Sequence, residues 1–233
     1  MNIRRSEERG KTNMGWLDSR HSFSFGEYFD SEQMGFRSLR VINEDRVAPG
    51  KGFPTHPHRS MEILSFVIQG SLAHKDDMGN ERCIDTGHFQ YMSAGDGVRH
   101  SEYNPSDVEP VHFLQIWIEP REKGGAPQYA DFKTDTATDA QSSQLLLLAS
   151  PDGVDGSAEI RQDAQVYYGE ILAGDEMELP EDSRFGYIWI QLISGQISLN
   201  GQILHSGDGV AIECDSLNLN STLRSKFLLF RLS

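Results

Sequence analysis

Two histidines lie two residues apart in the segment FPTHPHRSMEI, residues 53–63, with a proline between them. Proline fixes its own φ and has no backbone N–H, so Pro54 and Pro57 exclude a helix and favour an extended backbone. On a strand, residues i and i+2 point to the same face. We therefore expect the imidazoles of His56 and His58 to project side by side into the interior of a β-structure.

A second pair with the same spacing occurs in GDGVRHSEYN, residues 95–104, after a glycine-rich turn. Two such pairs on neighbouring strands can converge on one ion, and three imidazoles with one carboxylate suit a divalent transition metal. The expected ligands are His56, His58, His100 and Glu102. We expect iron(II) first, and the same ligands also accept copper, manganese, cobalt, nickel or zinc.

Other polar residues surround these pairs in the sequence. Glu62 could be a ligand, a supporting partner or a core-edge carboxylate, and we favour support through hydrogen bonds. Asn43 and Asp45, in VINEDRV, either support the site or make a turn, and we expect a turn. His74 lies on a polar segment and is expected to be solvated. His21 could line a pocket entrance, but we expect it to be packed.

The elements that would position these residues read as strands. MEILSFVIQGSLAHKD, VHFLQIWIEP and KFLLFRL are strand-like, and turn signals such as DDMGNE, SAGDG and LNGQ recur about every ten residues. No long segment shows a helical period, although short helical turns are expected in SEERGK and near ADFKTD. The sequence therefore predicts an all-β fold.

The two halves of the chain resemble each other. EILSFVIQGSLAHKDDMGNERCIDTGHFQYMSAG is similar in pattern to YIWIQLISGQISLNGQILHSGDGVAIEC. We predict two tandem β-barrels, with residues 1–120 as the barrel that holds the metal site, 121–144 as a linker and 145–233 as a barrel without one. In the second half DEMELP and CDSLNLN replace the two histidine pairs, which leaves Met177 and Leu179 where ligands would stand.

Composition limits the possible partners. The 233 residues include 35 acidic and 21 basic ones, for a formal net charge of -14. This balance disfavours nucleic acid and anionic membrane surfaces as partners. We expect no signal peptide and no membrane span. Cys83 and Cys214 form no motif, which favours reduced thiols. These features predict a cytoplasmic protein, with a monomer as the default.

Two motifs connect the sequence to a known superfamily. The first cupin motif is similar to the spacing of Gly50, His56, His58, Glu62 and Gly70. The second motif is matched more loosely by residues 87–104, with Ser93 where proline is usual and two extra residues before the histidine. WLDSRHSFSFGEYFD, MGFRSLRVINEDRVAPGKGFPTHPHRSMEI and MSAGDGVRHSEYNP resemble the pirin family more specifically, and within it the bacterial pirin-like proteins that act as quercetinases.

This resemblance implies a bicupin whose N-terminal barrel binds iron through three histidines and a glutamate, at His56, His58, His100 and Glu102. It also implies quercetin 2,3-dioxygenase activity, in which dioxygen cleaves the flavonol and carbon monoxide is released. Glu102 is the expected catalytic base. The alternative is an iron-dependent redox-sensing or protein-binding module without turnover. A third hypothesis is a vestigial bicupin in which the ion only stabilises the barrel.

Overall fold

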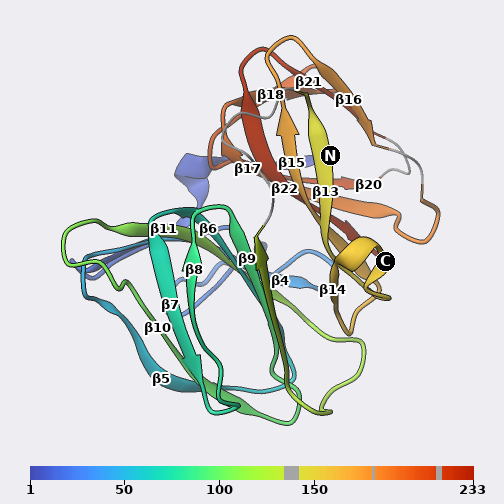
Figure 1. Ribbon diagram of the computed structural model, residues 1–233. Coiled ribbons are helices and arrows are strands. Elements are labelled where there is room, and N and C mark those ends of the chain that lie inside the picture. The colour runs from blue at the N-terminus through green and yellow to red at the C-terminus, as the bar shows by residue number, and fades with distance from the viewer. Residues whose placement is uncertain (134–141, 180–181, 214–216) are drawn as a thin grey trace. The chain divides into compact units, whose positions relative to one another are not determined.

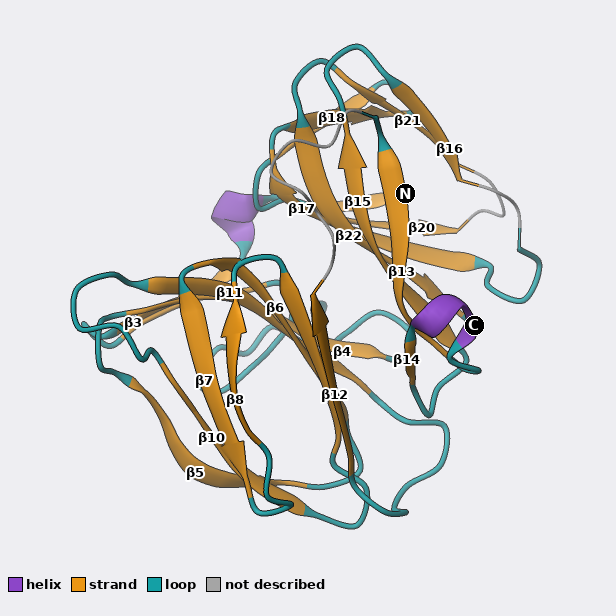
Figure 2. Cartoon of the chain, in the orientation of Figure 1, coloured by secondary structure: helices purple, strands orange, loops and turns teal. Residues whose placement is uncertain are grey.

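The computed structural model describes residues 1–133, 142–179, 182–213 and 217–233. The chain divides into two compact units, one of Gly10–Thr136 and one that joins Met1–Arg9 to Ala137–Ser233. We call them the N-terminal barrel and the C-terminal barrel. Each is built almost entirely of strands (Figure 2), as the sequence predicts.

The N-terminal barrel is made of two sheets (Figure 1). Its strands are β2 (Gly10–Asn13), β3 (Leu17–His21), β4 (Leu39–Val47), β5 (Gly52–His58), β6 (Glu62–Gln69), β7 (Ser71–Asp76), β8 (Glu81–Asp85), β9 (His88–Ser93), β10 (Val98–Tyr103), β11 (Val111–Ile118) and β12 (Gln128–Lys133). Seven strands pair in the order β12-β9-β6-β11-β4-β3-β2, and four pair in the order β5-β10-β7-β8.

The C-terminal barrel repeats this division into seven and four strands. Its elements are β1 (Asn2–Arg4), η1 (Ser6–Glu8), β13 (Gln144–Ser150), η2 (Val154–Gly156), β14 (Ala158–Glu159), β15 (Ala164–Ile171), β16 (Glu176–Leu179), β17 (Tyr187–Ser194), β18 (Gln196–Leu199), β19 (Gln202–His205), β20 (Gly209–Glu213), β21 (Leu217–Ser221) and β22 (Ser225–Leu232). The sheet orders are β1-β20-β17-β22-β15-β13-β14 and β16-β21-β18-β19. The predicted internal repeat and the two-barrel fold are therefore confirmed.

Each barrel has its core between its two sheets. In the N-terminal barrel, Leu72 and Ile84 of the four-stranded sheet cluster with Val67, Val111 and Phe113 of the seven-stranded sheet. Burial of such side chains stabilises a fold by about 1.5–3 kcal/mol each. This cluster fills only one part of the barrel interior, since polar side chains of the four-stranded sheet face inward elsewhere.

The corresponding region of the C-terminal barrel is apolar. β16 pairs with β21 so that Met177 lies opposite Leu219 and Leu179 lies opposite Leu217. Leu179, Leu217 and Leu219 are buried in the core cluster, and Met177 packs against it. Residues 214–216 of the CDSLNLN segment lie outside the described residues. The described side chains here therefore build a packed core rather than a ligand cluster.

The boundaries of the units differ from the predicted ones. β1 pairs with β20, with Ile3 opposite Val210, so residues 1–9 belong to the C-terminal barrel. β12 pairs with β9, so residues 128–133 of the predicted linker extend the N-terminal barrel. Residues 130–133 of the ADFKTD segment lie in this strand, and the rest of the region where a helical turn is expected lies outside the described residues; the turn in SEERGK is observed as η1. Both strands satisfy backbone groups at a sheet edge, a long-range requirement that the local pattern does not reveal.

A buried carboxylate fixes the N-terminal segment to the C-terminal barrel. Asp208 accepts hydrogen bonds from the Arg5 guanidinium at 2.8 Å and from the backbone N–H groups of Ser6 and His205 at 2.8 and 3.0 Å. Only 2% of its side chain is exposed. Loss of such a partner leaves buried donors unsatisfied, which costs about 1–3 kcal/mol for each group.

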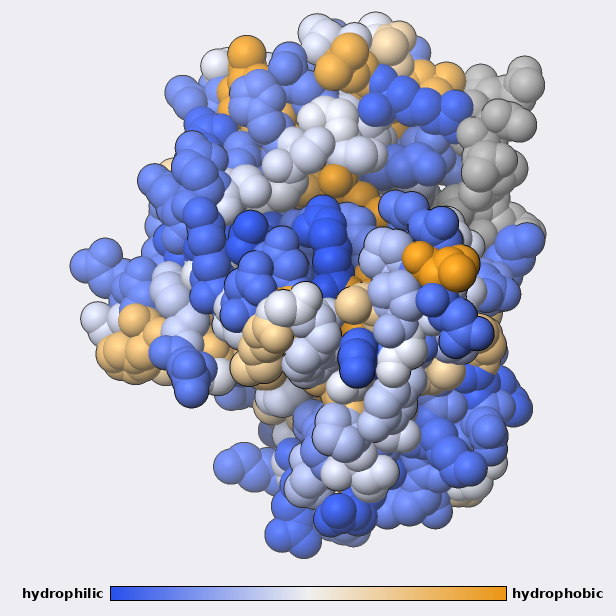
Figure 3. Space-filling view, turned by 90° about the vertical axis from the view of Figure 1, so that its left-hand side faces the viewer, coloured by the Kyte–Doolittle hydropathy of each residue, from blue (hydrophilic) through white to orange (hydrophobic). Residues whose placement is uncertain are grey.

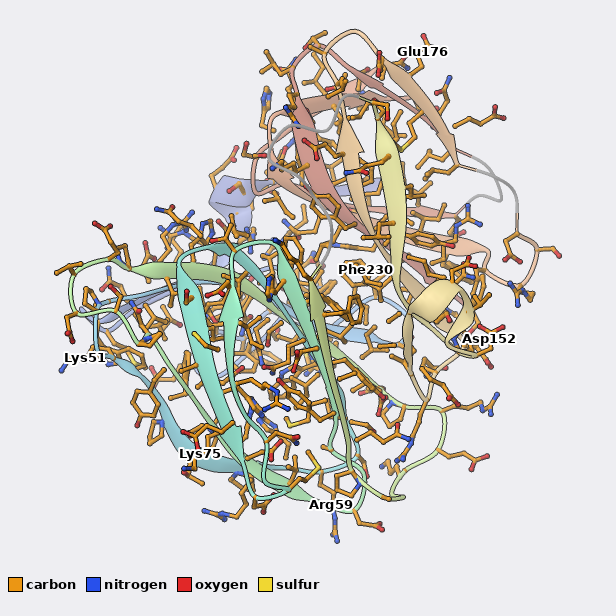
Figure 4. All side chains as sticks on the ribbon, viewed as in Figure 1. Lys51, Arg59, Lys75, Asp152, Glu176 and Phe230 are labelled. Carbon is orange, nitrogen blue, oxygen red and sulfur yellow. The ribbon has the colours of Figure 1, made fainter. Side chains whose placement is uncertain are left out.

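Asp208→Ala is therefore expected to lower the free energy of unfolding by roughly 2–4 kcal/mol, because several donors lose their acceptor together. Urea denaturation of the full chain measures this change. Glu176→Ala, which removes an exposed carboxylate from β16 of the same barrel (Figure 4), should change the free energy by less than about 0.5 kcal/mol. Equal stability of Asp208→Ala and wild type would contradict the assigned role.

The face of the molecule in Figure 3 agrees with the polar composition. Hydrophilic side chains predominate on the face shown in Figure 3, and hydrophobic ones form separate patches. Within the described residues, no helix is long and apolar enough to cross a membrane. Cys83 is an exposed free thiol on β8, and Cys214 lies outside the described residues.

Candidate metal centre

Three imidazoles converge inside the N-terminal barrel. β5 and β10 are neighbours in the four-stranded sheet, and their register places His56 opposite His100 and His58 opposite Val98. The Nε2 atoms of His56 and His100 lie 3.1 Å apart. The ring centroid of His58 lies 4.7 Å from that of His56 and 4.8 Å from that of His100. The predicted side-by-side projection of these histidines is what the structure shows.

The position of β5 explains how the strand tolerates two prolines. β5 is an edge strand, where a missing N–H can face away from the sheet without breaking a ladder. The pairing with β10 also contains a bulge, because His100 lies opposite His56 whereas Glu102 lies opposite Phe53. A bulge changes which side chains share a face. It brings Phe53 next to Glu102.

β5 lies close against β10 at Gly52. A Cβ atom on Gly52 would overlap the backbone carbonyl of Glu102, so only glycine fits without moving one of the strands. Gly52→Ala is expected to cost about 1–3 kcal/mol of stability and to weaken metal binding by displacing His56 and His58. Thermal unfolding and chelator competition measure the two effects.

Gly186→Ala is a matched control, because Gly186 also lacks a positive φ and a Cβ there would meet no atom within 4 Å. This variant should retain the wild-type melting temperature and metal affinity. If Gly52→Ala behaves in the same way as Gly186→Ala, the close approach of β5 and β10 does not matter for the cluster.

Glu102 is the fourth predicted ligand, and it is buried beside the histidines. It is 3% exposed and lies within hydrogen-bonding range of the Ser65 hydroxyl, at 3.4 Å. A ligand atom of Glu102 lies within 4.8 Å of ligand atoms of His74 and His100. Burial raises the pKa of Glu102 to about 7, and the negative charge of Asp45 adds to this shift. A nearby cation would favour the charged carboxylate.

The ring nitrogens fit a bound divalent cation. His56 donates from Nδ1 to the backbone carbonyl of Pro54 at 2.8 Å, which leaves the Nε2 lone pair free to coordinate. His58 Nε2 is buried and has no hydrogen-bond partner, which is rare in folded proteins. With His100 Nε2 facing that of His56, the imidazoles of His56, His58 and His100 form one group of ligand atoms, whereas Glu102 groups with His100 and His74. Imidazole and carboxylate donors of this kind suit a divalent transition metal.

The same environment keeps the imidazoles of His58 and His100 neutral. Burial lowers the pKa of His58 to about 4, and the neighbouring His56 adds to the shift. Burial lowers the pKa of His100 to about 2, helped by the imidazoles of His58, His56 and His74. Neutral imidazoles present the lone pairs that a metal ligand needs.

Glu62 lies apart from this cluster. It is 1% exposed on β6 and accepts a hydrogen bond from the Ser93 hydroxyl at 2.7 Å and another from Tyr91. Among the described residues, the groups of clustered ligand atoms contain His56, His58, His74, His100 and Glu102, but not Glu62. The structure therefore places this carboxylate among hydroxyls of β9.

His74 is a fourth histidine of the site, and the expectation that it is solvated is wrong. It lies on β7 opposite Glu102, and none of its side chain is exposed. Lys75, the next residue, points outward with 67% of its side chain exposed (Figure 4). The sequence contained a signal for this burial, because His74 shares its strand face with the core residue Leu72.

His74 is paired with a carboxylate. Its Nε2 lies 3.2 Å from Asp76 Oδ2. Burial lowers the pKa of His74 despite the opposing effect of Asp76. Burial acts to raise the pKa of Asp76, but hydrogen bonds from Asn80 and His74 outweigh it and hold that pKa below its usual value. The pair is thus a neutral imidazole against a charged carboxylate.

A pocket of about 340 Å³ lies beside the cluster. Its apolar wall includes the rings of Trp16, Phe25 and Phe53, and Trp16 meets Phe53 edge to face at 5.5 Å. Phe53 lies opposite Glu102, and the pocket residue Pro54 accepts the hydrogen bond from His56. The volume and the lining are those of a small-molecule site.

The polar wall of this pocket comes from β3 and β4. Asn43 and Asp45 are buried residues of β4, so the turn expected for them is wrong. His21 is packed, as predicted, and lines the pocket; its Nδ1 lies 2.7 Å from Asn43 Oδ1 and its Nε2 lies 2.8 Å from Thr12 Oγ1. Ser19 donates a hydrogen bond to Asp45. On each of β3 and β4 the polar residues are two positions apart, and this spacing places them on one interior face.

Two tandem barrels of this topology make the protein a bicupin, an all-β class. One of its barrels holds the histidine-rich cluster. The family model described as Pirin matches residues 2–118, and the model described as the quercetinase C-terminal cupin domain matches residues 147–232. This chain belongs to the pirin family.

Relatives with known names support this assignment over the full length. The chain is 44% identical over 231 residues to a quercetin 2,3-dioxygenase of Escherichia coli K12, covering 99% of this chain and 97% of that protein. The crystal structure of YhhW from Escherichia coli matches with a TM-score of 0.93 and 42% identity, covering 100% of this chain and 97% of that one. The nickel(II) complex of bacterial pirin YhhW also matches with a TM-score of 0.93, at 41% identity over 99% and 98% of the two chains.

Proposed function

We propose that this protein is a quercetin 2,3-dioxygenase whose N-terminal barrel binds a divalent metal through His56, His58, His100 and Glu102. The observation that best supports this proposal is the convergence of the His56, His58 and His100 imidazoles, with a Glu102 oxygen within 4.8 Å of a ring nitrogen of His100, near an aromatic-lined pocket. Relatives named quercetin 2,3-dioxygenase, two of them 44% identical, point to the same activity.

The donor set is compatible with several metals. We propose iron(II) as the native ion, and the nickel(II) complex of the related YhhW makes nickel a second candidate. When bound, the ion acts as a Lewis acid that lowers the pKa of the substrate hydroxyl it contacts.

Glu102 is the proposed catalytic base. Its burial and the charge of Asp45 raise its pKa to about 7 without a metal, and a bound cation would favour the charged carboxylate that accepts a proton. The proton would come from the 3-hydroxyl of the flavonol. Dioxygen is the oxidant, and carbon monoxide leaves as one product, so no external reductant is required.

The pocket provides the remaining contributions. The rings of Trp16, Phe25 and Phe53 offer apolar surfaces against which a flat aromatic substrate can pack. Packing of these rings around the substrate excludes water from the reacting centre. On the opposite wall, the buried polar groups of His21 and Asn43 are positioned to orient substrate hydroxyls.

The test is a flavonol-consumption assay on metal-free protein that has been reloaded without oxygen. Iron, copper, manganese, cobalt and nickel are added separately, quercetin is mixed in under air, and loss of flavonol absorbance and release of carbon monoxide are followed. We expect both signals with at least one metal. No loss above the metal-free protein with every metal would reject the enzyme and favour the protein-binding alternative. The monomeric state and cytoplasmic location remain predictions.

A further inference from the structure

We propose that His74 and Asp76 form a hydrogen-bonded chain with His100 that holds the His100 ring in the orientation needed to bind a metal. His74 is therefore a positioning residue. The inference depends on the ligand assignment made under the proposed function, but it does not depend on flavonol turnover.

The β7–β10 pairing brings these side chains together. The register places Asp76 opposite His100 and His74 opposite Glu102, so all four side chains lie on the inner face of the sheet. The His74 and His100 ring centroids are 5.3 Å apart. Their Nδ1 atoms are 3.5 Å apart, so one nitrogen must donate and the other must accept.

The proton positions on the two imidazoles follow from the groups at the two ends of the Asp76–His74–His100 series. At one end, His100 Nε2 faces His56 Nε2 and must be unprotonated to bind a metal, so the proton of neutral His100 lies on Nδ1. At the other end, the Asp76 carboxylate can only accept, so His74 carries its proton on Nε2. His74 Nδ1 is then an acceptor, and His100 Nδ1–H donates to it. The two assignments agree.

Further contacts hold His74 and Asp76 in place. Gln90 Nε2 lies 3.3 Å from His74 Nδ1, in agreement with an acceptor at that atom. The Tyr129 ring packs against the imidazole of His74 at 5.1 Å between centroids. Asp76 Oδ1 accepts from the backbone N–H groups of Met78 and Asn80 at 3.0 and 2.9 Å. The Asn80 amide donates to Asp76 Oδ2 at 2.8 Å.

The hydrogen-bonded series from Asp76 through His74 distinguishes His100 from His56, the other imidazole whose Nδ1 has a hydrogen-bond partner. His56 donates to the neutral backbone carbonyl of Pro54. His100 is connected through His74 to the carboxylate of Asp76, which makes its Nε2 more electron-rich and restricts rotation of its ring. Partners of this kind typically change metal affinity by about 10–100-fold.

The first measurement is Co(II) affinity of the full chain, determined by chelator competition without flavonol. His74→Phe is expected to weaken binding about 10–100-fold, because it keeps a ring in place but removes the acceptor. His74→Gln should recover part of the loss, since its amide oxygen can accept from His100 Nδ1–H. Asp76→Asn should weaken binding measurably, but by less than His74→Phe.

His112→Phe is the matched control. His112 is a histidine of the same barrel that is also paired with a carboxylate, at 2.9 Å from Glu44, but it lies outside the clustered ligand atoms. This variant should bind Co(II) with wild-type affinity.

The second measurement detects the hydrogen bond itself. In the Co(II) protein, the Nδ1–H protons of bound imidazoles give strongly shifted proton NMR signals. The signal from His100 should exchange slowly with solvent in wild type and rapidly in His74→Phe. The visible Co(II) absorption intensity should stay unchanged, because the number of ligands is the same.

Unchanged Co(II) affinity in His74→Phe would overturn the inference. A rise in absorption intensity in His74→Phe would show that His74 is itself a ligand and would also overturn it. If His74→Phe does not fold, unchanged Co(II) affinity in both His74→Gln and Asp76→Asn would also overturn the inference. Failure of wild type to bind Co(II) would overturn the ligand assignment and this inference together.

Discussion

Replacement of His100 by alanine is expected to abolish metal retention and flavonol cleavage together. His100 is fully buried, its Nε2 faces that of His56, and its ring contacts His58. A four-ligand protein site contributes about 10–16 kcal/mol of binding free energy, so one ligand accounts for roughly 3 kcal/mol. That loss weakens metal binding by about 100-fold or more.

Elemental analysis of the purified variant, followed by chelator competition, measures this loss directly. His88→Ala is the control, since His88 lies on β9 outside the clustered ligand atoms and should retain metal and activity. Because the alanine leaves a cavity, a melting curve of the metal-free proteins should accompany the assay. A His100→Ala protein that is folded and carries a full complement of metal would disprove the proposed centre.

Replacement of Glu102 by glutamine is expected to lower turnover even at saturating metal, and to weaken metal binding without abolishing it. The amide keeps the shape and one oxygen but cannot accept a proton from a hydroxyl. General-base catalysis contributes about 10²–10⁴-fold, so kcat at saturating metal should fall by that factor. Removing a charge buried beside Asp45 should also leave the metal-free protein at least as stable as wild type.

Flavonol consumption at matched metal content measures the effect of this substitution. Glu44→Gln provides the comparison, because Glu44 lies on the same barrel but pairs with His112 and not with the cluster. Its turnover should equal that of wild type. Full activity in Glu102→Gln would remove this carboxylate from the catalytic step.

The candidate site was predictable to the extent that it depends on local strand geometry. The spacing of two residues places His56 beside His58, and His100 beside Glu102, whatever the rest of the fold does. The sequence therefore predicts both pairs. The apolar residues Met177 and Leu179 likewise showed from sequence that the second barrel lacks such a pair on β16.

The burial of the remaining site residues depends on contacts between strands that are distant in the sequence, which is why their positions differ from those expected. His74 becomes part of the cluster only because β7 pairs with β10 in a register that places it opposite Glu102. Asn43 and Asp45 read as a turn because polar residues are common in turns, yet they lie on a strand that faces a pocket. Their burial depends on what packs above that strand.

By itself, the sequence determined the all-β class, the internal repeat and the two pairs of candidate ligands, because strand periodicity and turn residues act over a few positions. Only the tertiary structure decided that β1 completes the C-terminal barrel, that β12 completes the N-terminal one, and that His74 lies behind His100. Pairing partners and register depend on the combined burial and hydrogen bonding of segments far apart in the chain, and a local pattern does not contain that information.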